Sequence, residues 1–135
     1  MPGSVTPERV LVIDDDVAIT VSLAVVLRAK GYDVVTASDG PTGLARYRVH
    51  HPQIVISDIM MPGQAGIDTI DMIRRDSADV RIVAMSGSIE TRGGRVRDLA
   101  CSAGADVYLH KPFEMHELLD ALAHLPSVRD RPPSC

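Results

Sequence analysis

The sequence predicts an α/β fold in which helices cover both faces of a doubly wound parallel sheet. Five short runs rich in Val, Ile and Leu alternate with five segments of helical character. Such alternation implies parallel strands that are joined by right-handed crossovers. The 135 residues suit one domain with its own hydrophobic core and leave little room for a second domain.

The first strand and the first helix have clear boundary signals. Residues 1–8 contain two prolines and no apolar periodicity, so we expect a loose N-terminal arm. Residues 9–13 are a short apolar run of β-branched character and predict a strand. Residues 17–30 lack Gly and Pro and predict a helix, which Asp16 would cap and Gly31 would end.

A second strand and helix follow, and then a strongly apolar strand. Residues 32–36 are short and β-rich, and the turn residues at 38–41 start a helix that runs to about His50. Residues 54–58 read Ile-Val-Ile-Ser-Asp, which is typical of a strand buried on both faces. The strand therefore carries Asp58 at its end, beside a loop.

The second half of the chain continues the alternation. Ile67, Ile70 and Ile73 recur on one face of an expected helix, and a strand follows at 80–85. We then expect a helix from about Arg95 to Ala103 and a strand at 106–110. A last helix has a stripe of leucines and is ended by Pro126. Two glycines before Arg95 would cost a helix about 1–2 kcal/mol, which delays its start. We expect residues 126–135 to be a disordered tail and residues 9–125 to be the folded domain.

Composition limits the classes of function. The net charge of -4 excludes the basic footprint of a chain that binds nucleic acid directly. The sequence has no apolar run of the roughly 20 residues that a membrane helix needs, and no signal peptide. We therefore expect a cytoplasmic protein without membrane contact. Cys101 and Cys135 have no metal-ligand spacing, and we interpret them as free thiols.

Polar side chains stand at the ends of four expected strands. They are Asp14 and Asp15 after the first strand, Asp58 at the end of the third, Ser86 after the fourth and Lys111 after the fifth. In a doubly wound sheet, ligands bind outside the carboxyl ends of the strands, so we expect these side chains to share one crevice. Crowded carboxylates repel unless a cation lies among them, and such an oxygen donor set suits Mg²⁺. The lysine and the hydroxyl suit the oxygens of a phosphoryl group, and a carboxylate is able to serve as the nucleophile by forming an aspartyl phosphate.

Each of these residues also has an ordinary structural interpretation. Asp16 most simply caps a helix, and a lone Asp58 at a strand end is often a helix or turn cap. Ser86 could be a turn hydroxyl and Lys111 a solvated cation. Their joint placement at the strand ends of one sheet favours the functional interpretation.

Together these motifs resemble the receiver domain of two-component response regulators, in particular the stand-alone, chemotaxis-type regulators. The matching segments, in the family's order, are Val-Leu-Val-Ile-Asp14-Asp15-Asp16, Ser57-Asp58-Ile59-Met60-Met61-Pro62, Met85-Ser86-Gly87, Gly104-Ala105 and Lys111-Pro112-Phe113. The resemblance spans residues 9–125. It implies a flavodoxin-like three-layer sandwich with strand order 2-1-3-4-5.

The resemblance also implies roles at the site. Asp58 would accept a phosphoryl group from a histidine kinase or a histidine phosphotransfer protein. Mg²⁺, or Mn²⁺ in its place, would be held by the side chains of Asp15 and Asp58 and by the backbone carbonyl of Met60. Asp14 would hold a metal-bound water, which completes the expected metal site.

Further roles concern the response to phosphorylation. Ser86 and Lys111 would contact phosphoryl oxygens, and the Lys111–Pro112 bond would be cis. Tyr108 would rotate inward with Ser86 and change the surface of the fourth helix, the fifth strand and the fifth helix, to which a downstream protein target binds. We expect a monomer or a phosphorylation-dependent dimer, and a phosphoacceptor rather than an enzyme.

The chain departs from the family pattern in three places. Ala65 stands where the family loop has an acid, and Gly93-Gly94 would loosen the start of the fourth helix. Cys101 falls off the apolar stripe that contains Val96 and Leu99, so we expect it to be exposed.

Two other interpretations remain open at this point. The run Asp14-Asp15-Asp16 also fits the Asp-x-Asp pattern of haloacid-dehalogenase-type phosphatases, with Asp14 as nucleophile and Asp16 as general acid. That family needs a further acidic pair, which the residues after Lys111 lack in a strand context. A receiver-like interaction module without phosphorylation is the other alternative, and the intact set with Asp58 argues against it. No output domain follows Leu125 in this sequence, so we expect a stand-alone receiver, or else a piece of a longer regulator.

Overall fold

The computed structural model describes residues 7–60, 66–87 and 95–125. The strands are β1 (Arg9–Ile13), β2 (Asp33–Ala37), β3 (Ile54–Asp58), β4 (Arg81–Ser86) and β5 (Val107–His110). The helices are α1 (Val17–Ala29), α2 (Gly40–His50), α3 (Gly66–Asp76), α4 (Arg95–Ala103) and α5 (Met115–Ala123). Strands and helices alternate along the described chain, as the sequence predicted.

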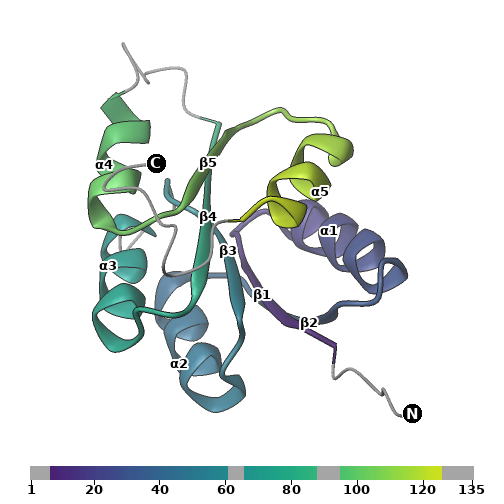
Figure 1. Cartoon of the computed structure of the whole chain (residues 1–135), viewed down its shortest axis with the longest axis horizontal. Coiled ribbons are helices and arrows are strands. Elements are labelled where there is room, and N and C mark those ends of the chain that lie inside the picture. The colour runs from purple at the N-terminus through teal and green to yellow at the C-terminus, as the bar shows by residue number, and fades with distance from the viewer. Residues whose placement is uncertain (1–6, 61–65, 88–94, 126–135) are drawn as a thin grey trace.

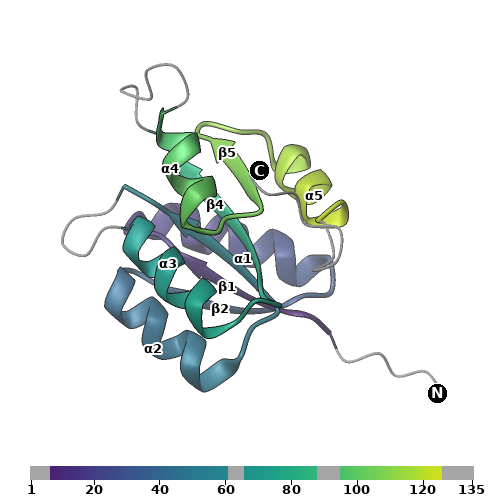
Figure 2. The ribbon, with the colours of Figure 1, turned by 60° about the vertical axis from the view of Figure 1, so that its left-hand side comes forward.

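All strand pairs are parallel, and the sheet has the order β2-β1-β3-β4-β5. Helices α1 and α5 lie on one face of the sheet, and α2, α3 and α4 lie on the other (Figure 1, Figure 2). The three-layer arrangement and the strand order confirm the predicted fold class. We call the edge at which the strands end the carboxyl edge.

The register of the strands aligns their ends at the carboxyl edge. Ile13 of β1 pairs with Ser57 of β3, Asp58 pairs with Met85 of β4, and Ser86 pairs with His110 of β5. Side chains that follow four different strands are thereby brought to one edge of the sheet.

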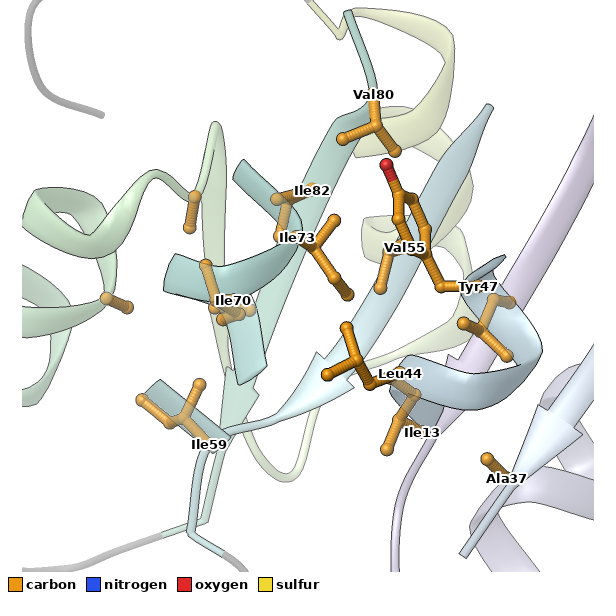
Figure 3. Close-up of a cluster of buried hydrophobic side chains, with 14 residues drawn as sticks. Ile13, Ala37, Leu44, Tyr47, Val55, Ile59, Ile70, Ile73, Val80 and Ile82 are labelled. Atoms are coloured by element: carbon orange, nitrogen blue, oxygen red, sulfur yellow. The ribbon is translucent and has the colours of Figure 1, made fainter. Parts of the chain in front are cut away.

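Two buried hydrophobic clusters lie on the two faces of the sheet, because successive strand residues point to opposite faces. The first cluster lies against α2, α3 and α4 and includes Leu11, Ile13, Leu44, Tyr47, Val55, Ile70, Ile73, Ile82, Ala84 and Ala100 (Figure 3). The second lies against α1 and α5 and includes Val10, Val12, Leu23, Leu27, Ile54, Ile56, Val83, Met85, Leu118 and Leu122. Burial of each large side chain contributes about 1.5–3 kcal/mol, so the two clusters stabilise the sheet that carries the strand ends.

The helix boundaries agree with the local signals in the sequence. Asp16 caps α1, since its side chain accepts a hydrogen bond of 3.0 Å from the amide of Ala18. Gly31 follows α1 with a φ of 97°, the left-handed conformation that suits glycine. The last helix is an exception, because it ends at Ala123 rather than at Pro126.

The expectations for α4 need correction. Cys101 is buried rather than exposed, whereas Leu99 on the expected apolar stripe is 49% exposed. The reason is that α4 packs against both α3 and β5, which turns its buried arc toward Ala100 and Cys101. Cys101 is also disulfide-bonded, so its interpretation as a free thiol was wrong.

Some predictions fall outside the described residues. These are the conformation at Ala65, the loosening at Gly93-Gly94 and the character of most of the two terminal segments. Among the described helices, none is both long and apolar enough to cross a membrane.

Candidate functional site

The acidic residues that follow β1 and end β3 meet at the carboxyl edge. Carboxylate oxygens of Asp14, Asp15 and Asp58 all lie within 4.8 Å of one another. Asp14 is fully buried and Asp58 is 5% exposed, while Asp15 is exposed to solvent. The structure thus brings together the three carboxylates that the sequence placed at strand ends.

Asp14 is held by the backbone around it. Its amide donates to the carbonyl of Ala37 at 3.1 Å, which extends the pairing of β1 with β2 by one residue. Its Oδ1 accepts a hydrogen bond of 2.9 Å from the amide of Asp16. These contacts orient the Asp14 side chain toward the site, while the Asp16 side chain caps α1.

Asp58 is positioned by the end of β3 and the start of α3. Its Oδ1 accepts a hydrogen bond of 2.9 Å from the amide of Met60, and the amide of Ile59 donates to Met85. A Cβ added to Gly66 would lie 2.3 Å from the backbone oxygen of Asp58. Glycine at this position therefore lets α3 begin directly against the residue that carries the carboxylate.

Lys111 bridges the two buried carboxylates. Its Nζ donates to Oδ2 of Asp14 at 2.7 Å and to Oδ2 of Asp58 at 3.0 Å. Its amide donates to the carbonyl of Ser86 at 2.8 Å, which ties the end of β5 to the end of β4. The Lys111–Pro112 bond is cis, as predicted.

The electrostatics of the site reflect an excess of acid. Burial raises the pKa of Asp58, although the Met60 amide and Lys111 oppose that rise. Burial acts to lower the pKa of Lys111, but its hydrogen bonds with Asp14 and Asp58 outweigh this effect and raise the pKa. Lys111 therefore stays cationic at neutral pH, and within the described part of the chain this one cation meets three carboxylates.

The three carboxylates fit a hard divalent cation. Mg²⁺ takes oxygen ligands and retains several waters, so a site with few protein carboxylates and one exposed side is suitable. Asp15 supplies the exposed side, and Asp14 and Asp58 supply the buried oxygens. The ligand role of the Met60 carbonyl stays a prediction.

Ser86 and Tyr108 lie on the neighbouring strands. Ser86 is fully buried at the end of β4, beside the residue that precedes Lys111. Tyr108 packs partly buried against the first hydrophobic cluster. Their positions are compatible with the predicted switch, but the roles of both residues stay predictions.

His110 was not among the residues that the sequence indicated for the site. The hydroxyl of Tyr108 lies 3.4 Å from Nδ1 of His110. The signal in the sequence was their spacing, because residues two apart on a strand share one face.

The same geometry bears on the phosphatase interpretation. One oxygen of Asp16 is engaged as the α1 cap, and Asp14 is fully buried beneath Lys111. A nucleophile needs an approach for its substrate, and a general acid needs a free carboxyl group. The arrangement therefore argues against Asp14 as a nucleophile with Asp16 as its general acid.

The chain is similar in sequence to known proteins. The response regulator receiver domain family matches residues 10–123 of the chain. Protein PilG of Pseudomonas aeruginosa is 38% identical over 125 residues, which cover 88% of each chain. The DNA-binding response regulator MtrA of Mycobacterium tuberculosis is 38% identical over 112 residues, which cover 83% of this chain and 47% of MtrA. The chain thus spans about half the length of MtrA.

Solved structures show the same fold. The chemotaxis response regulator CheY4 of Vibrio cholerae superposes with a TM-score of 0.78 at 27% identity, over 90% of this chain and 100% of that chain. The response regulator TrrA of Thermotoga maritima, in complex with Mg²⁺ and BeF, superposes with a TM-score of 0.77 at 32% identity, over 88% and 99%.

Proposed function

The chain belongs to the response regulator receiver domain family, and from this membership we propose that Asp58 is its phosphoacceptor. The observation that carries the proposal is the arrangement in which Lys111 bridges Asp14 and Asp58 while Asp15 lies beside them. Receiver domains take part in two-component signalling, so the proposed donor is a phosphohistidine on a kinase or on a phosphotransfer protein.

In the proposed reaction, a carboxylate oxygen of Asp58 forms a bond to phosphorus while the bond from phosphorus to the donor imidazole breaks. The imidazole leaves with the electron pair of that bond. The hydrogen bond from Met60 and the buried end of β3 hold Asp58 in place for the attack. Mg²⁺ bound by the carboxylates would neutralise charge that develops on the phosphoryl oxygens.

Lys111 and Ser86 would bind the oxygens of the transferred phosphoryl group. Lys111 is cationic and already contacts Asp58, so it is able to exchange that contact for a phosphoryl oxygen. Ser86 at the neighbouring strand end supplies a hydroxyl donor. Movement of these two residues toward the new group would draw Tyr108 inward and change the surface made by α4, β5 and α5.

The changed surface is the proposed output of the protein. Leu99 on α4 is a large exposed apolar side chain on it and suits a protein partner. We propose that a downstream protein binds here in the cytoplasm, to a monomer or to a dimer that forms on phosphorylation.

The experiment is to incubate the protein with acetyl phosphate and Mg²⁺ and to locate the added mass by peptide mass spectrometry. We expect one phosphoryl group on Asp58, no product with Asp58→Asn and little product when EDTA removes the metal. Asp68→Asn, which changes an exposed acid in the first turn of α3, is the matched control and should react like the wild type. Phosphorylation of Asp14 would instead support the phosphatase interpretation, and no phosphorylation would support the interaction module.

A further inference from the structure

Strand β5 carries a side-chain contact that lies outside the carboxylate cluster. The hydroxyl of Tyr108 is 3.4 Å from Nδ1 of His110, two residues further along the strand. When the imidazole carries its proton on Nε2, Nδ1 accepts a hydrogen bond from the phenol. The two side chains point to the face of β5 that α4 covers, since Tyr108 packs against the first hydrophobic cluster.

The two ends of the Tyr108 side chain have different surroundings. The ring packs partly buried against the first cluster, and its strand position pairs with the fully buried Ala84 of β4. The hydroxyl lies at His110, which is exposed to solvent. The contact with His110 therefore holds the polar end of the ring toward the surface.

His110 is also close to the site along the backbone. It pairs with Ser86 in the β4–β5 register, and the next residue, Lys111, donates its amide to the carbonyl of Ser86. The residue that holds the Tyr108 hydroxyl is thus directly next to both groups that are proposed to move toward the phosphoryl group. A shift of either group would therefore act directly on the backbone of the residue that contacts the Tyr108 hydroxyl.

We propose that His110 is a positioning residue that retains Tyr108 in its outward position while Asp58 is unphosphorylated. The inference rests on the proposed function of Asp58. Inward movement of the ring separates the hydroxyl from Nδ1, so the hydrogen bond exists in one state only and shifts the equilibrium toward that state. Because the pair is exposed, its contribution is modest and corresponds to roughly a threefold change in the equilibrium.

The test uses beryllium fluoride with Mg²⁺ as the probe and follows the amide NMR signal of Gly87 beside the site. We expect His110→Leu to lower the midpoint concentration of beryllium fluoride about threefold. His110→Gln retains a hydrogen-bond acceptor and should bind like the wild type. His50→Leu, at the end of α2 and near the start of β1, is the control for loss of a histidine.

A double-mutant cycle separates the hydrogen bond from other effects of the substitution. In a Tyr108→Phe background, His110→Leu should leave the midpoint unchanged, because the hydroxyl is already absent. Equal tightening in both backgrounds, or no tightening in the wild-type background, would overturn the proposal.

A direct measurement covers the unphosphorylated protein. The ¹⁵N chemical shift of Nδ1 in His110 should change on Tyr108→Phe and should not change on Tyr32→Phe. An unchanged shift in Tyr108→Phe would overturn the positioning role even if beryllium fluoride binds normally. Failure of the wild type to bind beryllium fluoride, with the shift change intact, would instead overturn the proposed function of Asp58 and, with it, the link of the hydrogen bond to phosphorylation.

Discussion

Two buried ion-pair clusters lie on the same sheet and differ in how well their charges are matched. At the carboxyl edge, Lys111 is the cation that bridges the two buried carboxylates of Asp14 and Asp58. In the second cluster, Arg74 of α3 pairs with the buried Asp106, which directly precedes β5. The side chains of the two cations are almost equally buried, at 17% and 16% exposure.

The Arg74 cluster matches its charge with many acceptors. Arg74 donates to the carbonyl of Gly104 at 3.0 and 2.8 Å and to the carbonyl of Val80 at 2.6 Å. Asp106 accepts from Arg74 at 3.0 Å and from the amide of Ile82 at 2.8 Å. The planar guanidinium thereby joins α3, the start of β4 and the turn between α4 and β5.

The site cluster, which consists of Asp14, Asp15, Asp58 and Lys111, is different because its negative charge exceeds its positive charge. Among the residues that the structure describes, this cluster has three carboxylates for one lysine, and burial raises the pKa of Asp58. The comparison shows that burial of charge serves two ends in this protein. The Arg74 cluster pairs its charge with acceptors and stabilises the fold, whereas the carboxylate cluster lowers stability at the site that we propose to bind a metal ion and a phosphoryl group.

The largest effect should come from Arg74→Met. The substitution leaves the Asp106 carboxylate buried without its cation, and we expect a loss of about 3–5 kcal/mol in the free energy of unfolding. Urea denaturation followed by circular dichroism measures this change. The matched control is Arg75→Met, whose side chain is 79% exposed and pairs with Asp71, and it should change stability by less than about 1 kcal/mol. Similar losses in both variants would contradict the comparison.

Addition of Mg²⁺ should raise the free energy of unfolding of the protein, because we propose that the ion binds at the site cluster. At a concentration about 100 times the dissociation constant, a ligand that binds only the folded state adds about 2.7 kcal/mol. We expect a rise of that size in the free energy of unfolding of the wild type and a smaller rise for Asp58→Asn. Denaturation in Ca²⁺-free buffer, with and without Mg²⁺, measures this rise in the free energy of unfolding. An equal rise in both proteins would place the ion elsewhere.

Substitution of Gly104 should damage the Arg74 cluster by about 2 kcal/mol. Gly104 has a φ of 121°, and an added Cβ would lie 2.7 Å from Cγ of Arg74. Gly31→Ala is the control, because Gly31 also has a positive φ but has no atom within 4 Å of the added Cβ. We expect Gly104→Ala to cost more than Gly31→Ala in urea denaturation. Equal costs would show that the contact with Arg74 is unimportant.

The smallest expected effect is a gain in stability from Asp58→Asn without metal. Because the folded protein raises the pKa of Asp58, it disfavours the charged form, so the wild type loses stability as the pH rises above the ordinary value of 3.8. We expect the variant to be more stable by about 1 kcal/mol at neutral pH.

The pH series provides the check on that gain. Below pH 3.8 the Asp58 carboxyl is protonated in both the folded and the unfolded wild type, so the advantage of the variant should shrink there. Asp68→Asn serves as the control for removal of an exposed carboxylate. An advantage that stays constant with pH would contradict the account of the site cluster.

The carboxylate site could be predicted largely from the sequence. Asp14, Asp58 and Lys111 each follow an apolar run, and in a parallel sheet the ends of such runs meet at one edge. The apolar runs, together with the rule that parallel strands end at one edge of the sheet, were therefore enough to place these residues together. The contact that Lys111 makes with both carboxylates at once could not be predicted, because it depends on the path of the backbone after β5.

The sequence by itself determined the alternation of strands and helices, the Asp16 cap and the set of residues at the carboxyl edge, because these depend on periodicity and on neighbours along the chain. Only the tertiary structure decided the exposure of Leu99, the burial of Cys101 and the binding of Arg74 to Gly104 and Asp106. A short helix such as α4 is turned by the elements on which it packs, and a long side chain reaches across the chain to partners that no local spacing indicates.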